Sequence, residues 1–96
     1  MIVNAWAVAD GHQDEFVEAL VGLFEHLCTL EGFVEGAILQ GVNPTRFISY
    51  MRLRSAQDRQ RVLDDREASA RLRAVGRIAR ADLHSYDVLR AFGRAG

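Results

Sequence analysis

The sequence predicts a single α+β domain whose strands and helices follow the order βαββαβ. The length of 96 residues suits one core. Runs rich in β-branched and aromatic residues alternate with segments of helical period, and turn signals separate them. This order is the split βαβ, or ferredoxin-like, arrangement, in which a four-stranded antiparallel sheet carries its helices on one face. We expect one domain over residues 1–96, with residues 93–96 as a frayed tail.

Residues 1–9 are predicted to form the first strand, because they are rich in β-branched and aromatic side chains and Asp10-Gly11 follows as a turn signal. Side chains alternate along a strand, so Asn4 and Trp6 share one face. Both faces of this strand look covered. A polar Asn4 between apolar neighbours then needs a hydrogen-bond partner from the substrate or the protein.

Residues 12–30 predict an amphipathic helix, since apolar residues recur at helical spacing. Asp10 and Gln13 resemble a capping box at its start, and Gly32 ends it. The stripe consists of Phe16, Leu20, Leu23, Phe24 and Leu27, widened by Val17, Val21 and Cys28. We expect Cys28 to pack in the core. The apolar stripe is wider than a contact with one sheet requires, so part of it could form a cavity wall or a subunit contact.

A hairpin is predicted next, from residues 33–42 and 46–54 joined at Asn43-Pro44. The odd positions of the second of these strands face one way; they are Phe47, Ser49, Met51 and Leu53.

The last third of the chain predicts a helix in two parts and a final strand. Ser55 to Asp58 is a capping-box signature, Asp64-Asp65 interrupts the helix, and residues 67–81 resume it. Residues 85–92 are the predicted last strand. Helices on one face leave the other face of the sheet open, and a second copy related by a two-fold axis is the simplest cover, so we expect a homodimer.

Composition excludes several kinds of chemistry. The twelve basic residues are all Arg and lie beyond residue 45, so Schiff-base lysine chemistry is ruled out. One cysteine permits neither an intrachain disulfide nor a four-cysteine zinc site, and we see no His/Asp metal cluster. The arginines alternate with acids and lack a stacking motif, so we expect no nucleic-acid partner. Without a 20-residue apolar stretch or a signal-like N-terminus, we expect no membrane partner and a cytoplasmic protein.

Three motifs together resemble the antibiotic biosynthesis monooxygenase family: Asp10-Gly-His-Gln-Asp-Glu-Phe16, Leu30-Glu-Gly-Phe33, and Arg46-Phe-Ile-Ser-Tyr50 followed by Ser55. The resemblance covers nearly the whole chain. It implies a dimeric α+β barrel in which two sheets pack face to face and each subunit keeps a pocket between its own sheet and helices. It also implies oxygenation of an aromatic polyketide without metal or flavin: an anthrone or hydroquinone loses a proton, and its anion reduces dioxygen, the co-substrate.

The resemblance also suggests site residues. The family's polyketide oxygenases carry an Asn, a Trp and an Arg where this chain has Ser49, Leu53 and Arg73, so two of the three are replaced. Trp6 is a hypothetical substitute for the missing indole. A sister group that degrades haem has an Asn at the position of Asn4, but the helix positions here hold neither its Trp nor its His.

The hypotheses for the site are therefore as follows. Arg73, Asn4, Trp6 and Ser49 are the candidate catalytic residues, and His84 is the best-placed titratable base. The candidate substrate-binding residues are Phe47, Met51, Leu53, Phe16, Leu20 and Phe24. No resident cofactor or metal is expected. A polyketide cyclase on the same fold and a non-catalytic ligand-binding dimer are the alternatives to an oxygenase.

Overall fold

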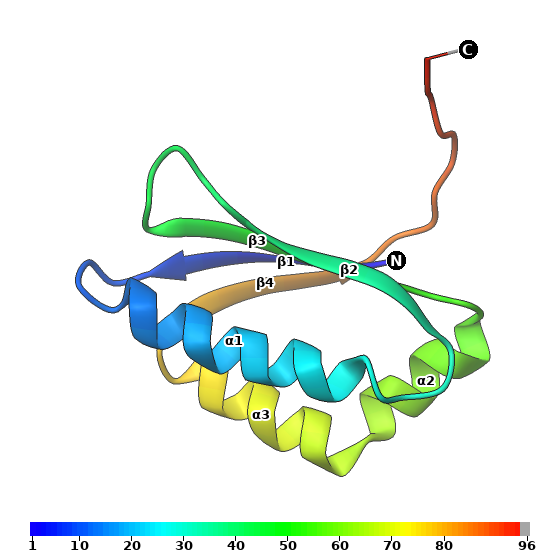
Figure 1. The fold of residues 1–96 in the computed structure, drawn as a ribbon, viewed down its shortest axis with the longest axis horizontal. Helices are drawn as coiled ribbons and strands as arrows, with labels where there is room; N and C mark the ends of the chain where they lie inside the picture. The colour runs from blue at the N-terminus through cyan, green and yellow to red at the C-terminus, as the bar shows by residue number, and fades with distance from the viewer. Residues whose placement is uncertain (95–96) are drawn as a thin grey trace.

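A computed structural model describes residues 1–94 and has the predicted element order (Figure 1). The elements are β1 (Ile2–Val8), α1 (Gln13–Leu27), β2 (Phe33–Gln40), β3 (Arg46–Leu53), α2 (Ala56–Asp64), α3 (Arg66–Gly76) and β4 (Ala79–Ser85). The strands form one antiparallel sheet in the order β2-β3-β1-β4. All three helices lie against the same face, so the predicted ferredoxin-like fold is confirmed.

The predicted position of the last strand is wrong. β4 spans Ala79–Ser85 and not residues 85–92, because it pairs with β1 from Val8 opposite Ala79 to Ile2 opposite Ser85. The ladder then ends where Tyr86 exchanges hydrogen bonds with Met1. An earlier strand also ends α3 at Gly76, well short of residue 81. Of the predicted frayed tail, residues 95 and 96 lie outside the described residues.

The start and the end of α1 also differ from the prediction. His12 is the N-cap and makes no side-chain capping bond, so Asp10 and Gln13 form no capping box. Instead the Gln13 side chain donates to Asp10 Oδ1 (3.2 Å) and accepts from the Gly11 N–H (2.8 Å), which fixes the turn before the helix. At the other end the helix stops at Leu27, and Gly32 provides the positive φ of the following turn.

The core lies between the helices and the inward face of the sheet. Four residues of α1 on one stripe are buried: Phe16, Leu20, Leu23 and Leu27. They pack against the even-numbered side chains of β1 and the odd-numbered side chains of β3, as the alternation predicts. Cys28 is exposed, which corrects its assignment to the core: it caps the helix, one residue beyond the last helical position.

The odd-numbered face of β1 is open in the single chain. Ala5 is exposed and Val3 and Ala7 are half-buried, so the prediction that both faces are covered is wrong for one chain. No helix within residues 1–94 combines the length and the apolar character needed to cross a membrane.

His26 joins the helices α1 and α3. Its Nε2 lies 2.6 Å from Asp65 Oδ2 and its Nδ1 lies 2.5 Å from Glu67 Oε2, and the ring is largely buried. Asp65 is also the N-cap of α3, accepting from the Ala68 N–H. This hydrogen bond, followed by the one from His26, lowers the pKa of Asp65. The cluster therefore holds the end of α1 against the start of α3.

A second carboxylate, Asp58, fixes the start of α2. The first half of the predicted capping box is confirmed, because the Asp58 N–H donates to the N-cap Ser55 Oγ. In the return contact the Asp58 carboxylate accepts from the Ser55 hydroxyl, not from the Ser55 backbone N–H. Arg54 Nε donates to Oδ2 at 3.0 Å and Arg61 Nη1 to Oδ1 at 3.3 Å. A Cβ on Gly32 would lie 2.2 Å from Asp58 Cγ, so this turn requires glycine for space as well as for φ.

These contacts predict how stability depends on pH. The hydrogen bond from Arg54 lowers the pKa of Asp58, so its contribution to stability is present above about pH 4 and is lost as the pH falls further. We expect Asp58→Asn to reduce the melting temperature at neutral pH and to weaken its fall between about pH 5 and pH 2. Asp65 should preserve part of that fall, because its pKa is also lowered.

Thermal unfolding followed by circular dichroism at a series of pH values checks this prediction. Asp64→Asn is the matched control, because Asp64 accepts from Gln60 and has no arginine partner in the described part of the chain. A parallel acid profile for Asp58→Asn and wild type would contradict the assignment.

Candidate active site

A cavity of about 70 Å³ lies between the inward face of the sheet and the three helices. Its walls are mostly apolar and come from α1, α2, α3 and the three strands β1, β3 and β4. Asn4 and Ser49 are the polar side chains on its sheet side, and Ser69 is the polar side chain on its helix side. A wider, shallow hollow lies on the open face of the sheet, around Ala5, Ala7 and Ile48. The enclosed cavity is the better candidate site, because its few polar groups converge in an apolar setting.

Asn4 brings an unsatisfied acceptor to this cavity. Its side chain is buried, and Oδ1 has no hydrogen-bond partner among residues 1–94. Ser49 on β3 and Leu83 on β4 are its neighbours across the sheet. An unpaired buried acceptor costs roughly 1–3 kcal/mol, so the site gains stability when a ligand donates a hydrogen bond to Oδ1.

Ser49 is held in place by Trp6. Trp6 Nε1 donates to Ser49 Oγ at 2.9 Å, and both residues are only 2% exposed. The indole N–H occupies a lone pair of Oγ, and the hydroxyl proton of Ser49 remains available to donate. Asn4 and Ser49 therefore present an acceptor and a donor side by side on adjacent strands.

The Trp6 side chain lies in the core, behind the wall of the cavity. Its ring packs edge-on against Phe16 with centroids 5.4 Å apart, and Phe16 packs against Phe47 at 4.8 Å. None of these three rings lines the cavity. They form an aromatic cluster that fixes the orientation of Ser49.

The remaining predicted residues divide between the cavity and its surroundings. Leu20, Phe24 and Met51 line it, whereas Leu53 is half-buried against the core outside it. Arg73 is exposed on α3, but its Nη1 lies 3.5 Å from the hydroxyl of Ser69, a lining residue. Arg73 therefore stands at the rim of the cavity.

Several lining residues had no place in the sequence hypotheses. Ala68 and Leu72 lie four residues apart on α3 and line the cavity, but helical spacing alone gives no sign that this side faces a cavity. Leu83 was missed because the last strand was placed too late. The other unpredicted lining residues are Ile2, Leu23, Leu27, Tyr50, Val62, Leu63 and Ser69.

The histidines lie away from the cavity. His84 pairs with Val3 in the β1–β4 ladder, which places it on the open face, where Nε2 contacts Asp82 at 2.8 Å. His12 contacts Glu15 at the start of α1, and His26 is bound to Asp65 and Glu67. Within residues 1–94, no three His, Cys, Asp or Glu side chains are grouped so as to hold a metal ion.

Several solved structures have the same fold as this chain. No protein-family model and no curated protein matches the sequence. SnoaB from Streptomyces nogalater, a cofactor-independent oxygenase, superposes with a TM-score of 0.88 at 14% identity, over 97% of this chain and 95% of that one.

Two further structures agree with this likeness. A protein from Deinococcus radiodurans, provisionally described as an antibiotic biosynthesis monooxygenase, gives a TM-score of 0.82 at 12% identity over the whole of both chains. PA3566 from Pseudomonas aeruginosa gives 0.77 at 13% identity, over 93% of this chain and 92% of that one. The chain therefore has the fold of the solved antibiotic biosynthesis monooxygenases, as its sequence motifs indicated.

Proposed function

We propose that this protein is a cofactor-independent oxygenase that acts on an anthrone- or hydroquinone-type substrate of aromatic polyketide or related secondary metabolism. The observation that carries the proposal is the unpaired Asn4 Oδ1 beside the Ser49 hydroxyl in an apolar cavity. A phenolic hydroxyl can donate to Asn4, while a neighbouring carbonyl or phenolate oxygen accepts from Ser49. The shared fold of SnoaB supports the choice of chemistry.

The reaction requires the substrate to lose a proton and become an electron-rich anion. The Ser49 hydroxyl stabilises the negative oxygen that develops, and Trp6 keeps that hydroxyl oriented. Among residues 1–94, the cavity lining contains no carboxylate and no histidine, so in this proposal the proton leaves to water at the rim. There the positive charge of Arg73 favours the anion over the neutral substrate.

Dioxygen then receives the electrons. The anion transfers one electron to dioxygen, and the two radicals combine into a C–O bond. The resulting peroxide anion takes up a proton from water, and the hydroperoxide loses water to leave a new carbonyl group. For an anthrone, one CH₂ group and one dioxygen give one C=O group and one water overall. The apolar walls admit dioxygen, and they exclude the water that would compete for the hydrogen bonds of Asn4 and Ser49.

The size of the cavity restricts how the substrate binds. A volume of about 70 Å³ is below the roughly 300 Å³ at which ligand sites usually begin. Leu63 lines the cavity and is half-exposed, and Leu72 stands beside it on α3. We propose that these two side chains, on α2 and α3, move aside when a ring enters.

We also propose that the protein is a homodimer joined through the open face of its sheet. Strand pairing places an apolar group at the centre of this face, composed of Val3, Ala5, Ala37, Leu39, Ile48 and Tyr50. Charged or titratable side chains of both signs surround it: Glu35, Arg46, Arg52, Arg80, Asp82 and His84. An apolar centre with a polar rim is the usual composition of a protein interface.

Product mass tests the proposed reaction. The protein is incubated with an anthrone under ¹⁸O₂ and under argon, beside a protein-free control for spontaneous oxidation. We expect a quinone that contains one labelled oxygen, formed only under ¹⁸O₂ and faster than in the control. Water loss from an uncyclised aromatic polyketide under both gases would identify a cyclase, and binding without turnover would identify a ligand-binding protein.

The variant Asn4→Leu should change stability and activity in opposite directions. The variant removes the buried unpaired acceptor, so we expect the free protein to become more stable by about 1 kcal/mol. Turnover should fall by about a hundredfold or more, because the substrate hydroxyl loses its acceptor. Melting temperature and kcat/KM measure the two effects, and a variant that is less stable yet fully active would contradict both.

A double-mutant cycle tests the role given to Trp6. Trp6→Phe keeps an aromatic ring in the core and removes the hydrogen bond to Ser49. We expect it to lower kcat by at least about tenfold in the presence of Ser49 and to have little further effect in Ser49→Ala. An unimpaired Trp6→Phe enzyme would rule out the role, and equal losses in both backgrounds would assign Trp6 to packing alone.

A further inference from the structure

Two arginines on the open face of the sheet stand on either side of one small residue. Arg46, at the start of β3, and Arg80, near the start of β4, are both paired with Ala7 of β1. Neighbouring strands lie about 4.8 Å apart, so the Cα atoms of the two arginines are separated by about 10 Å. The methyl group of Ala7 fills little of the space between them. Two exposed guanidinium groups can therefore approach one ligand from opposite sides.

The acids of the open face already have partners. Glu35 on β2 contacts Arg52 on β3 at 3.4 Å, and Asp82 contacts His84 at 2.8 Å within β4. Neither of the two arginines beside Ala7 has a carboxylate partner within residues 1–94. The pairing of the acids with other bases therefore leaves unpaired positive charge at this end of the face.

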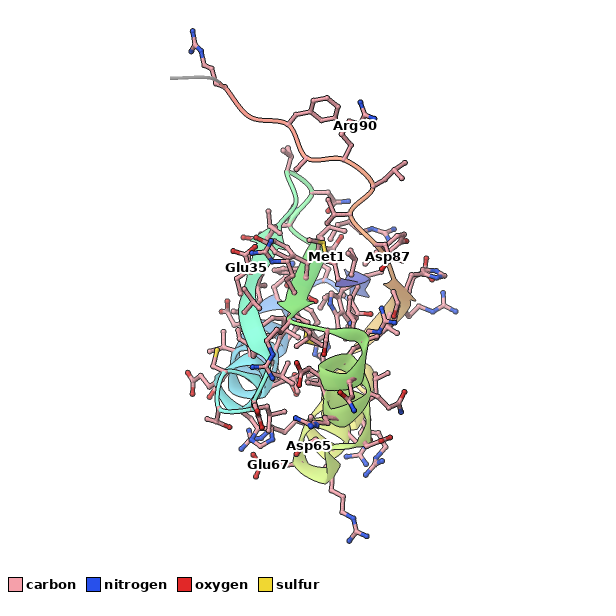
Figure 2. All side chains as sticks on the ribbon, turned by 90° about the vertical axis from the view of Figure 1, so that its right-hand side faces the viewer. Met1, Glu35, Asp65, Glu67, Asp87 and Arg90 are labelled. Carbon is pink, nitrogen blue, oxygen red and sulfur yellow. The ribbon has the colours of Figure 1, made fainter. Side chains whose placement is uncertain are left out.

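Acids elsewhere in the molecule face in other directions. Figure 2 views the sheet from the end where Asp87 lies, which is the end opposite Ala7, and it shows Asp65 on the helical side. Asp10 is closer along the chain, but it lies in the turn before α1, where its carboxylate accepts from Gln13. None of these acids forms an ion pair with the two arginines in the described part of the chain.

The two arginines line a hollow of about 600 Å³ and stand on fixed backbone. The Arg46 N–H donates to the carbonyl of Asn43, and its own carbonyl accepts from the Gly41 N–H at 2.7 Å, so the turn holds its position. The β1–β4 ladder holds Arg80 in the same way. A ligand therefore has to order only the guanidinium groups, and a site on rigid strands loses less entropy on binding than one on a loop.

A third arginine adds positive charge on the other side of Arg80. Arg77 follows α3 and lines a second hollow together with Ala7 and Arg80. It too has no carboxylate partner within residues 1–94. A carboxylate has one negative charge and two oxygens, whereas a phosphate monoester has nearly two charges and three terminal oxygens. Guanidinium groups bind phosphate oxygens in pairs, so three arginines around one point fit phosphate better than carboxylate.

We propose that Arg46 and Arg80 bind a phosphate dianion, free or as the phosphate group of a small monoester, with Arg77 beside it. The phosphate lies over Ala7, and each arginine donates to a different oxygen. Side chains alternate along β1, so this site is on the opposite face of the strand from Trp6 and the enclosed cavity. It also lies beyond the apolar centre of the open face, and it requires neither the reaction nor the dimer of the proposed function.

Titration of the ¹⁵N-labelled full chain with phosphate, followed by NMR, tests the site. Inorganic phosphate and phenyl phosphate are the two probes, at constant ionic strength because exposed charges are screened by salt. We expect saturable shifts at the Ala7 amide and at the Nε–H groups of Arg46 and Arg80. Each of the variants Arg46→Gln and Arg80→Gln should raise the dissociation constant at least about fivefold. Tighter binding of phenyl phosphate would identify a monoester as the ligand, and equal binding would identify free phosphate.

Arg66→Gln is the matched control, because it removes the same charge from an exposed position at the start of α3, on the helical side. It should leave the dissociation constant unchanged, and all three variants should keep the circular dichroism of wild type. Shifts that never saturate, or equal weakening in all three variants, would reduce the binding to general charge attraction and overturn the site. The site would also be overturned if the protein ignored phosphate while Arg46→Gln or Arg80→Gln dissociated a dimer in analytical ultracentrifugation, since the arginines would then pair with acids of a second copy.

Discussion

The two-residue alternation of β1 determines which side chains the helices cover, and the rest of the molecule depends on it. One face of this central strand carries Ile2, Asn4, Trp6 and Val8 into the core, and the other face carries small residues outward. Because β1 pairs with both β3 and β4, its register also sets their inward faces. A shift by one residue would turn Asn4 and Trp6 out of the core together.

Because all three helices pack against one face of the sheet, its two faces have different surroundings. The covered side is apolar enough to exclude water, and it contains a polar pair, Asn4 and Ser49, at one level of the sheet. The open side has an apolar centre that a single chain leaves in contact with solvent. In the proposed function, chemistry and assembly therefore use opposite faces of the same strands.

Ser49 and Leu53 stand where the resemblance implied an Asn and a Trp. The structure shows what each replacement does to the cavity. Leu53 lies outside the cavity, so the missing indole leaves no gap in its wall. The indole that is present, Trp6, approaches Ser49 from the core side and acts through a hydrogen bond. The cavity is small, and its polar character comes from Asn4 and Ser49 on the sheet and Ser69 on α3.

Sequence by itself determined the element order, the strand faces and the N-cap at Ser55, because alternation, helical period and capping depend on neighbours within a few residues. It also selected Asn4, Ser49, Leu20, Phe24 and Met51, which proved to line the cavity. The tertiary structure alone decided where β4 begins, since that depends on which residues of β1 are free to pair. It alone decided the partner of Trp6, the burial of His26 between two carboxylates and the position of Arg73 at the rim. The contacts of Trp6 and His26 join residues far apart in the chain, and their meeting depends on how the helices pack across the sheet, which no local pattern encodes. Arg73 contacts Ser69 within one helix, but only the packing of that helix on the sheet brings Ser69 to the cavity.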